Sequence, residues 1–148
     1  MMPSGWARRI AARLRGLPDR PRGLRGAGYD WERAAEKALT DGGYRIVARN
    51  FSTRSGEIDF VAEENDVLCF VEVKGRSGEG FGAPAEAVTA EKQRRIFRAA
   101  ESYLRRQSGR RPTCRFDVVT ILEKPGEQSR VEILKDAFRG PVEPRRRR

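Results

Sequence analysis

The residues best suited to chemistry are carboxylates on two neighbouring apolar segments. Alternation along residues 67–75 places Glu72 and Lys74 on one face of a strand, and alternation along residues 56–63 places Asp59 on one face of the strand before it. If the two strands pair in register, the carboxylates repel each other unless a cation or a proton lies between them. Oxygen ligands of this kind suit Mg²⁺ or Mn²⁺, and the lysine can position a water molecule. The alternative is an ordinary ion pair between Glu72 and Lys74.

Two predicted helices add further polar candidates. An apolar stripe predicts a helix at about residues 30–41, and Glu32 falls at the edge of that stripe, so that its carboxylate can look along the sheet. A second helix is predicted from about Thr89, as N-cap, to Gln107. Gln93 lies within the apolar arc of this second helix, where a polar amide needs a partner. That partner is either the candidate site or nearby backbone.

The remaining pattern predicts the elements that hold these side chains. Strands are expected at residues 44–51, 56–63, 67–75, 115–122 and 130–135, with Asp30 capping the first helix and Gly42 and Gly43 ending it. The order is α-β-β-β-α-β-β. It predicts an α/β fold with one mixed sheet flanked by helices, in which the strand before the second helix pairs in parallel with the strand after it. Asp117, on the fourth strand, is expected to pair with a nearby arginine.

Composition narrows the range of chemistry. The 148 residues contain no histidine and two cysteines, which excludes Ser-His-Asp triads, Cys-His pairs and imidazole zinc sites. The formal net charge is +10, and it arises at the two ends, because residues 1–26 carry +6 and residues 139–148 carry +4. We therefore expect one domain at 27–138 between a disordered arginine-rich extension and a basic tail. Trp6, Ile10, Leu14 and Leu17 have helical spacing, so that a short basic amphipathic helix is the alternative there.

Charge is also divided within the middle of the chain. Residues 27–91 carry −6 and residues 92–115 carry +8. Carboxylates for a cation beside arginines for a phosphate backbone suit an enzyme that acts on a phosphate polymer, whereas a solvated helix face is the alternative. The candidate nucleic-acid contacts are Arg54, Arg76, Arg94, Arg95 and Arg98. No apolar run reaches the length of a membrane span or a secretory signal, so we expect a cytoplasmic protein.

Eight short motifs, in order, resemble one protein family. They are Trp31-Glu32, Gly43-Tyr44, Arg49-Asn50-Phe51, Gly56-Glu57-Ile58-Asp59, Phe70-Val71-Glu72-Val73-Lys74, Phe81-Gly82, Lys92-Gln93 and Arg115-Phe116-Asp117-Val118-Val119. This pattern resembles the YraN-like family of bacterial proteins, which is similar to archaeal Holliday-junction resolvases and belongs to the PD-(D/E)XK nuclease superfamily. The match covers about residues 28–138 and implies a restriction-endonuclease-like fold. Ile58 departs from the superfamily pattern, which has proline before the aspartate.

The resemblance implies a role for each matched residue. Asp59 and Glu72, with the carbonyl of Val73, would bind Mg²⁺, and Glu32 would support a second metal or the water network. Lys74 would position the attacking water, and Gln93 would orient the site. The expected function is a Mg²⁺- or Mn²⁺-dependent endonuclease acting on DNA, branched DNA included, with a homodimer expected by analogy. The alternatives are a catalytically silent nucleic-acid-binding module with the same fold, and a protein-interaction factor with basic tails.

Overall fold

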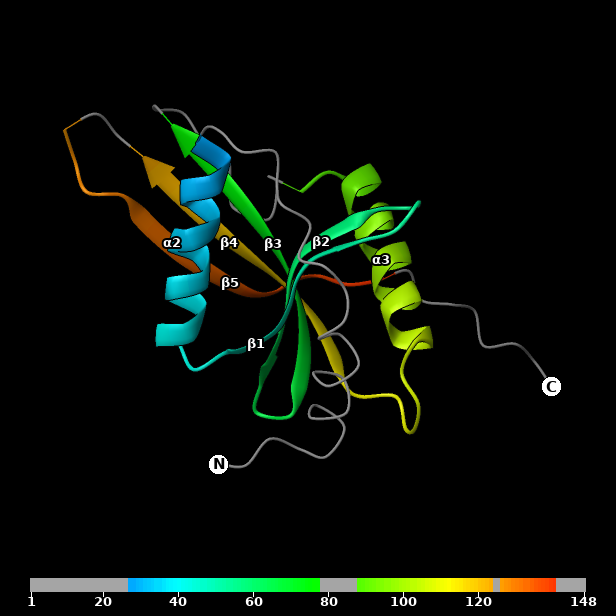
Figure 1. Ribbon diagram of the computed structural model, residues 1–148. Helices are drawn as coiled ribbons and strands as arrows, with labels where there is room; N and C mark the ends of the chain where they lie inside the picture. Colours follow the sequence, from blue (N-terminus) through cyan, green and yellow to red (C-terminus); the bar gives the residue numbers. More distant parts are fainter. Residues whose placement is uncertain (1–26, 78–87, 124–125, 141–148) are drawn as a thin grey trace.

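A computed structural model describes residues 27–77, 88–123 and 126–140 of the chain. Two helices and five strands make up this part (Figure 1). The elements are α2 (Ala27–Asp41), β1 (Arg45–Ser52), β2 (Glu57–Glu64), β3 (Val67–Ser77), α3 (Ala90–Arg105), β4 (Cys114–Glu123) and β5 (Arg130–Phe138). The expected extension at 1–26, with its amphipathic alternative, and most of the expected basic tail lie outside the described residues.

The strands form one mixed sheet in the order β1-β2-β3-β4-β5. Strands β3 and β4 are parallel and the other neighbouring pairs are antiparallel. This confirms the predicted α/β class, the element order and the parallel pairing across the second helix. Helices α2 and α3 cover opposite faces of the sheet, so the molecule has three layers (Figure 1).

Each face of the sheet carries its own apolar core. The α3-side core joins the inner face of α3, including Ile96 and Tyr103, to side chains of β1, β2, β3, β4 and β5. Tyr103 is fully buried, and its ring meets Phe51 and Phe70 edge to face with centroids 5.1 and 5.8 Å apart. The α2-side core is smaller and centres on Ala35 and Leu39, which are both fully buried. The two helices are therefore fixed on the sheet from both sides.

The helix ends agree with the sequence in part. The Thr89 side chain accepts a hydrogen bond from the backbone N–H of Lys92, which confirms the predicted N-cap of α3. Gly43 has a φ of +91° just after α2, as the predicted glycine stop requires. The prediction that Asp30 caps the first helix is wrong, because α2 begins at Ala27 and Asp30 lies within it. Aspartate is only mildly unfavourable inside a helix, so its presence did not end the helix.

A glycine allows α2 to approach the end of β3. A Cβ atom added to Gly75 would lie 1.8 Å from the indole ring of Trp31, so the ring occupies the space that any other side chain would need. Because Gly75 follows Lys74 directly, this contact seats the first part of α2 beside the segment that carries Glu72 and Lys74. The contact therefore links the helix of Glu32 to the strand of the other candidates.

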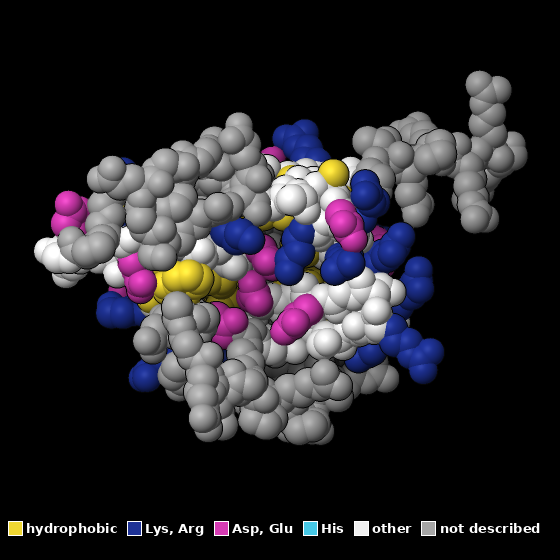
Figure 2. All heavy atoms as spheres, turned by 90° about the horizontal axis from the view of Figure 1, so that it is seen from above, with side chains coloured by type: hydrophobic (Ala, Val, Ile, Leu, Met, Phe, Trp, Pro, Cys, Tyr) yellow, Lys and Arg dark blue, Asp and Glu magenta, His cyan; other side chains and the backbone are white. Residues whose placement is uncertain are grey.

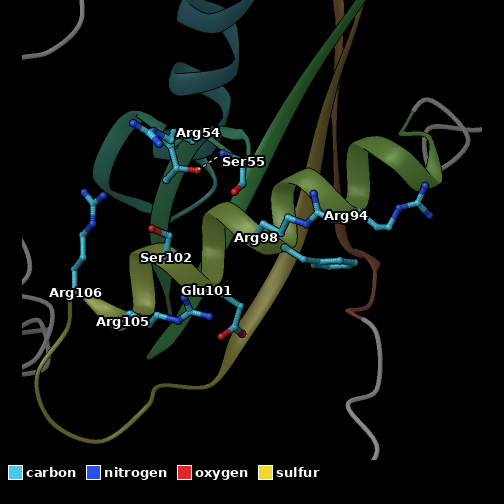
Figure 3. A pocket seen from close by; sticks show the side chains of 10 residues that line it. Arg54, Ser55, Arg94, Arg98, Glu101, Ser102, Arg105 and Arg106 are labelled. Atoms are coloured by element: carbon cyan, nitrogen blue, oxygen red, sulfur yellow. Dashed lines mark hydrogen bonds between the residues drawn. The ribbon is translucent and has the colours of Figure 1, made fainter.

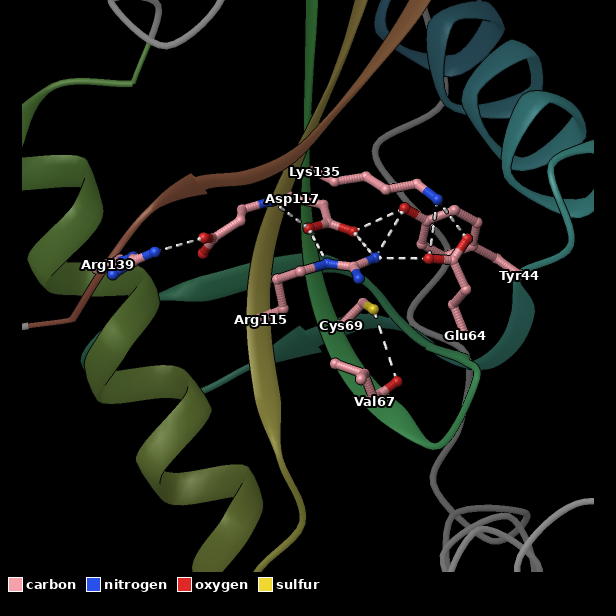
Figure 4. Close-up of polar contacts among 9 residues, drawn as sticks. Tyr44, Glu64, Val67, Cys69, Arg115, Asp117, Lys135 and Arg139 are labelled. Carbon is pink, nitrogen blue, oxygen red and sulfur yellow. Dashed lines mark hydrogen bonds and ion pairs between the residues drawn. The ribbon is translucent and has the colours of Figure 1, made fainter.

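A buried carboxylate ties together strands on the α2 side of the sheet (Figure 4). Asp117 is fully buried and accepts hydrogen bonds from Tyr44 Oη at 2.7 Å, Arg115 Nε at 2.8 Å and the backbone N–H of Asp136 at 2.9 Å. The expected pairing of Asp117 with an arginine is confirmed. These bonds connect β4 to the start of β1 and to β5, so the Asp117 side chain acts as an internal brace.

A second carboxylate extends this cluster (Figure 4). Glu64 accepts from Arg115 Nη2 at 3.0 Å and from Lys135 Nζ at 2.8 Å. Burial alone would raise the pKa of Glu64, but the hydrogen bonds from Lys135 and Arg115 hold it below its usual value. Hydrogen-bond donors therefore satisfy both Asp117 and Glu64.

Asp117→Ala should destabilise the protein strongly. The change leaves the Arg115 guanidinium, the Tyr44 hydroxyl and the Asp136 N–H without their buried acceptor, which should lower the free energy of unfolding by about 3–5 kcal/mol. Urea unfolding followed by circular dichroism measures the loss. The matched control is Asp41→Ala, which removes an exposed ion pair with Lys37 and should cost less than about 1 kcal/mol. Equal losses in the two variants would contradict the brace.

Candidate functional site

The turn between β2 and β3 places the two candidate carboxylates opposite each other. Asn65 and Asp66 form this two-residue turn, with φ values of 47° and 65°, as in the type I′ turns that suit a tight hairpin. The antiparallel register that follows pairs Phe60 with Val71. One step further along both strands, Asp59 lies opposite Glu72, on the face of the sheet that α3 covers.

A side-chain bond fixes Asp59 at this point. The backbone N–H of Val73 donates to Asp59 Oδ2 at 2.8 Å, just beyond the last paired residues of the β2–β3 ladder. The bond holds the Asp59 carboxylate against β3, beside the side chain of Glu72. The prediction that strand alternation and register would bring Asp59 and Glu72 together is confirmed.

Glu72 is an electrostatically unfavourable carboxylate. Its side chain is 8% exposed, and burial together with the negative charge of Asp59 raises the pKa of Glu72 to about 8. Lys92 opposes this shift, because its Nζ lies 3.2 Å from Glu72 Oε1. The site therefore contains two adjacent carboxylates whose repulsion one lysine offsets in part.

Lys92 is the residue of this site that sequence reasoning missed. In the sequence it stands only as part of the motif Lys92-Gln93, and a lysine in the first turn of a helix looks there like any solvated lysine. The structure turns it toward β3 from the N-terminal turn of α3. The rotation of α3 about its axis, set by the packing of Ile96 and Tyr103, is what brings the ammonium to Glu72.

The other predicted site residues lie around this pair. Lys74 is half-buried on β3, two residues after Glu72 and so on the same face. Glu32 is half-buried on α2, the helix that covers the opposite face of the sheet. In the part of the chain that the structure describes, no three acidic side chains gather as a metal-binding group. The structure thus joins Asp59 with Glu72 and leaves Glu32 outside the pair.

Gln93 uses its amide on the backbone. Its Nε2 donates to the carbonyl of Val88 at 3.0 Å, and Val88 is a buried member of the α3-side core. This is the backbone alternative that the sequence left open for Gln93. The bond fastens the segment before α3 to the helix and so helps to hold the turn that carries Lys92.

The predicted arginine contacts divide into two groups. Arg54, Arg94 and Arg98 line one groove at the outer side of α3, whereas Arg95 forms an ion pair with Glu91 at 2.9 Å. The side chain of Arg76 lies outside the described side chains. Seen from above, acidic side chains gather near the middle of the surface and lysines and arginines lie beside them (Figure 2).

The donor set fits a hard divalent cation. Two carboxylates in contact supply the oxygen atoms that Mg²⁺ and Mn²⁺ prefer, and a cation between them would relieve the repulsion that raises the pKa of Glu72. The brace at Asp117 is the opposite case, because N–H and O–H donors already satisfy that carboxylate. Glu72 differs from Asp117, because burial and the neighbouring charge of Asp59 raise its pKa.

Glu72→Gln should remove a pH dependence from the stability. The folded pKa lies above the usual value of 4.5, so folding takes up a proton between these values. The contribution of Glu72 to the free energy of unfolding is therefore fully present below about pH 4.5. It is lost as the pH rises toward 8. Relative to wild type, the variant should gain on the order of a few kcal/mol between pH 5 and pH 8 without added metal.

Urea unfolding at several pH values in EDTA measures this difference. Glu57→Gln, at an exposed carboxyl two residues from Asp59 on β2, serves as the matched control and should follow the wild-type curve. A constant difference between Glu72→Gln and wild type across this range would contradict the assigned electrostatics.

Comparison with known proteins identifies the family to which the chain belongs. The profile described as "Uncharacterised protein family UPF0102" matches residues 31–121. A UPF0102 protein of Symbiobacterium thermophilum is 50% identical over 114 residues, which cover 77% of this chain and 97% of that protein. A UPF0102 protein of Rhodococcus opacus is 48% identical over 111 residues, with 75% and 94% covered, respectively. A UPF0102 protein of Chlorobaculum tepidum is 43% identical over 116 residues, with 75% and 90% covered.

The matched region contains every predicted catalytic and metal-binding residue, from Glu32 on α2 to Gln93 on α3. The YraN-like family that the sequence motifs resemble is this same family. Membership of the PD-(D/E)XK superfamily is consistent with these matches. No helix among the described residues is long and apolar enough to cross a membrane. On the evidence of the profile and of relatives that align over nearly their whole length, the chain belongs to the UPF0102 family.

Proposed function

We propose that the chain is a Mg²⁺- or Mn²⁺-dependent endonuclease that hydrolyses phosphodiester bonds in DNA, branched DNA included. The observation that carries this proposal is the contact of Asp59 with the buried Glu72, where the charge of Asp59 helps to raise the pKa of Glu72. A structural role alone gives no reason to place two like charges side by side on the core-facing side of a sheet. The resemblance to PD-(D/E)XK nucleases supplies the reaction class.

Asp59 and Glu72, with the carbonyl of Val73, would hold the cation. Bound there, the cation would offset the negative charge that develops on the phosphate during attack. Asp59 is oriented for this by the N–H of Val73, and Glu72 is fixed by its burial. Glu32 would add to the water network from α2.

Lys74 would act on the attacking water. Its ammonium group can donate hydrogen bonds to a water molecule and hold it in line with the phosphorus atom, while its charge favours the phosphate. Attack forms one P–O bond and breaks another, and the proton of the water passes to solvent as the leaving oxygen is released. Lys92, whose Nζ lies 3.2 Å from Glu72 Oε1, would offset part of the negative charge of that carboxylate. Gln93 would keep α3 seated through Val88.

One observation favours a second candidate, a catalytically silent nucleic-acid-binding module. Lys92 already neutralises part of the charge on Glu72, and the described residues supply no third carboxylate to the pair. Such a protein would bind DNA through its arginines and would not cut it in any divalent metal. The experiment below separates the two candidates.

Asp59→Asn and Glu72→Gln should each abolish metal-dependent cutting. Linear, nicked, flapped and four-way DNA are incubated with the full chain and a titration of Mg²⁺ or Mn²⁺, and products are resolved on denaturing gels. Loss of one ligand should lower the rate by about a hundredfold or more, since the cation contributes several kcal/mol. Glu57→Gln, the same chemical change on the same strand, should leave the rate within about twofold. Cutting that survives both site variants would overturn this mechanism, and no cutting by the wild type would favour the silent module.

Mg²⁺ should also stabilise the protein without any substrate. Because the cation binds the folded pair and not the unfolded chain, it should raise the melting temperature of the wild type, more so at pH 8 than at pH 5, where protons compete for Glu72. Glu72→Gln and Asp59→Asn should lose this shift, whereas Glu57→Gln should keep it. Equal shifts in all four proteins would show that Mg²⁺ does not act through the pair.

A further inference from the structure

A basic groove lies between α3 and the turn that joins β1 to β2 (Figure 3). Its volume is about 650 Å³, within the usual range for ligand sites. Arginines dominate its walls, with three hydroxyl side chains and one acidic residue among them. The lining residues are Thr53, Arg54, Ser55, Arg94, Phe97, Arg98, Glu101, Ser102, Arg105 and Arg106.

The helix presents its arginines as a row. Arg94, Arg98 and Arg105 are four and seven residues apart, so they fall on one side of α3. That side faces away from Ile96 and Tyr103, which pack against the sheet. The row is about 16 Å long, because an α-helix rises 1.5 Å per residue. Arg54 faces the same groove from the turn (Figure 3).

Among the described residues, no carboxylate neutralises the positive charge of the row. In the described part of the chain, no carboxylate forms an ion pair with Arg54, Arg94, Arg98 or Arg105. The acidic lining residue, Glu101, is already paired with Arg111, which lies outside the groove. Several unpaired guanidinium groups around one groove repel one another, and a bound anion would offset that repulsion.

A glycine holds the turn against α3 and so closes the groove on one side. A Cβ atom at Gly56 would lie 2.4 Å from the carbonyl oxygen of Arg95, so no other residue fits without moving the turn off the helix. Within the turn, Thr53 N–H donates to the Gly56 carbonyl at 2.8 Å and Ser55 N–H donates to Thr53 Oγ1 at 3.1 Å. These contacts therefore fix the turn that carries Arg54 beside α3.

We propose that this arginine groove binds the phosphodiester backbone of a nucleic acid strand. Guanidinium groups match phosphate oxygens in pairs, and the hydroxyls of Thr53, Ser55 and Ser102 add neutral donors. A row of positive charges about 16 Å long suits a polymer that carries a negative charge on every nucleotide. A membrane surface fits less well, because Phe97 is the one large apolar side chain in the lining and it packs on Phe116.

The groove is also placed to serve the carboxylate pair. Strand β2 runs from the turn at Gly56 to Asp59, three residues and about 10 Å away. That distance equals about three steps of a nucleic acid strand at 3.4 Å each. A strand held in the groove would therefore reach Asp59 and Glu72 within a few nucleotides. This second part rests on the proposed function, whereas binding in the groove does not.

The test compares two variants that lose the same charge. Arg94→Gln/Arg98→Gln removes two groove arginines, and Lys37→Gln/Arg130→Gln removes two exposed cations on α2 and β5. Both changes are made in the full chain carrying Asp59→Asn, and binding of fluorescent duplex and four-way DNA is measured by anisotropy in EDTA between 50 and 300 mM salt, roughly the range over which phosphate contacts weaken. Circular dichroism checks that both variants fold.

The groove variant should bind DNA about tenfold more weakly or worse, since it loses two charged hydrogen-bonding groups. Its slope of log Kd against log salt should fall by about two, one for each phosphate that is no longer neutralised. The control should stay within about twofold. Equal effects in the two variants, or none in the groove variant, would overturn the proposal. Equal affinity of the wild type for poly-glutamate of the same charge would overturn the choice of nucleic acid.

Cutting assays distinguish failure of the groove proposal from failure of the nuclease proposal. If the Asp59-intact protein binds DNA through the groove and never cuts it, the nuclease proposal fails and the groove stands. If the protein cuts DNA and the groove variant cuts with unchanged KM and kcat, the groove proposal fails and the nuclease stands. A rise in KM at nearly constant kcat is the result that supports both.

Discussion

The antiparallel register between β2 and β3 is the constraint on which the candidate site depends. The positive φ angles of Asn65 and Asp66 define a two-residue turn, and a turn of that length leaves one register for the strands that follow it. In this register Asp59 lies opposite Glu72, six positions from the turn on each strand and one step beyond the pair Phe60 and Val71. A slip by one residue would send one carboxylate to the α2 side, because side chains alternate between faces. The like-charge contact is thus specified by the backbone and is not left to side-chain rotamers.

Helix α3 contributes to both candidate sites, the Asp59–Glu72 pair and the arginine groove. Its first turn sends Lys92 to Glu72, and its middle receives the β1–β2 turn where Gly56 touches the backbone of Arg95. Both contacts require one position and one rotation of the helix, which the packing of Ile96 and Tyr103 in the α3-side core sets. A change that shifted α3 on the sheet would therefore disturb the charge balance at Glu72 and the shape of the groove together.

The sequence predicted the strand part of the site better than the helix part. Period-two alternation and a short turn suffice to bring Asp59 beside Glu72, because they leave only the register to be found. A helical pattern shows which residues face the core but not which face of the sheet the helix covers. Glu32 was therefore expected near the pair, although α2 covers the opposite face. Lys92 was missed for a related reason, since its direction depends on how α3 is seated, and the start of α2 was misplaced because Asp30 is tolerated inside a helix.

Two buried carboxylates on opposite faces of this sheet differ in how far the fold satisfies their charge. Asp117 lies opposite Val71 and Glu72 lies opposite Val118 on the parallel neighbours β3 and β4, so the two positions are adjacent along the strands. Asp117 accepts hydrogen bonds from a tyrosine, an arginine and a backbone N–H. Glu72 has one lysine and a second carboxylate instead, and its pKa rises. The same sheet therefore contains one buried carboxylate that hydrogen-bond donors satisfy and one whose pKa is raised by burial and by a neighbouring carboxylate.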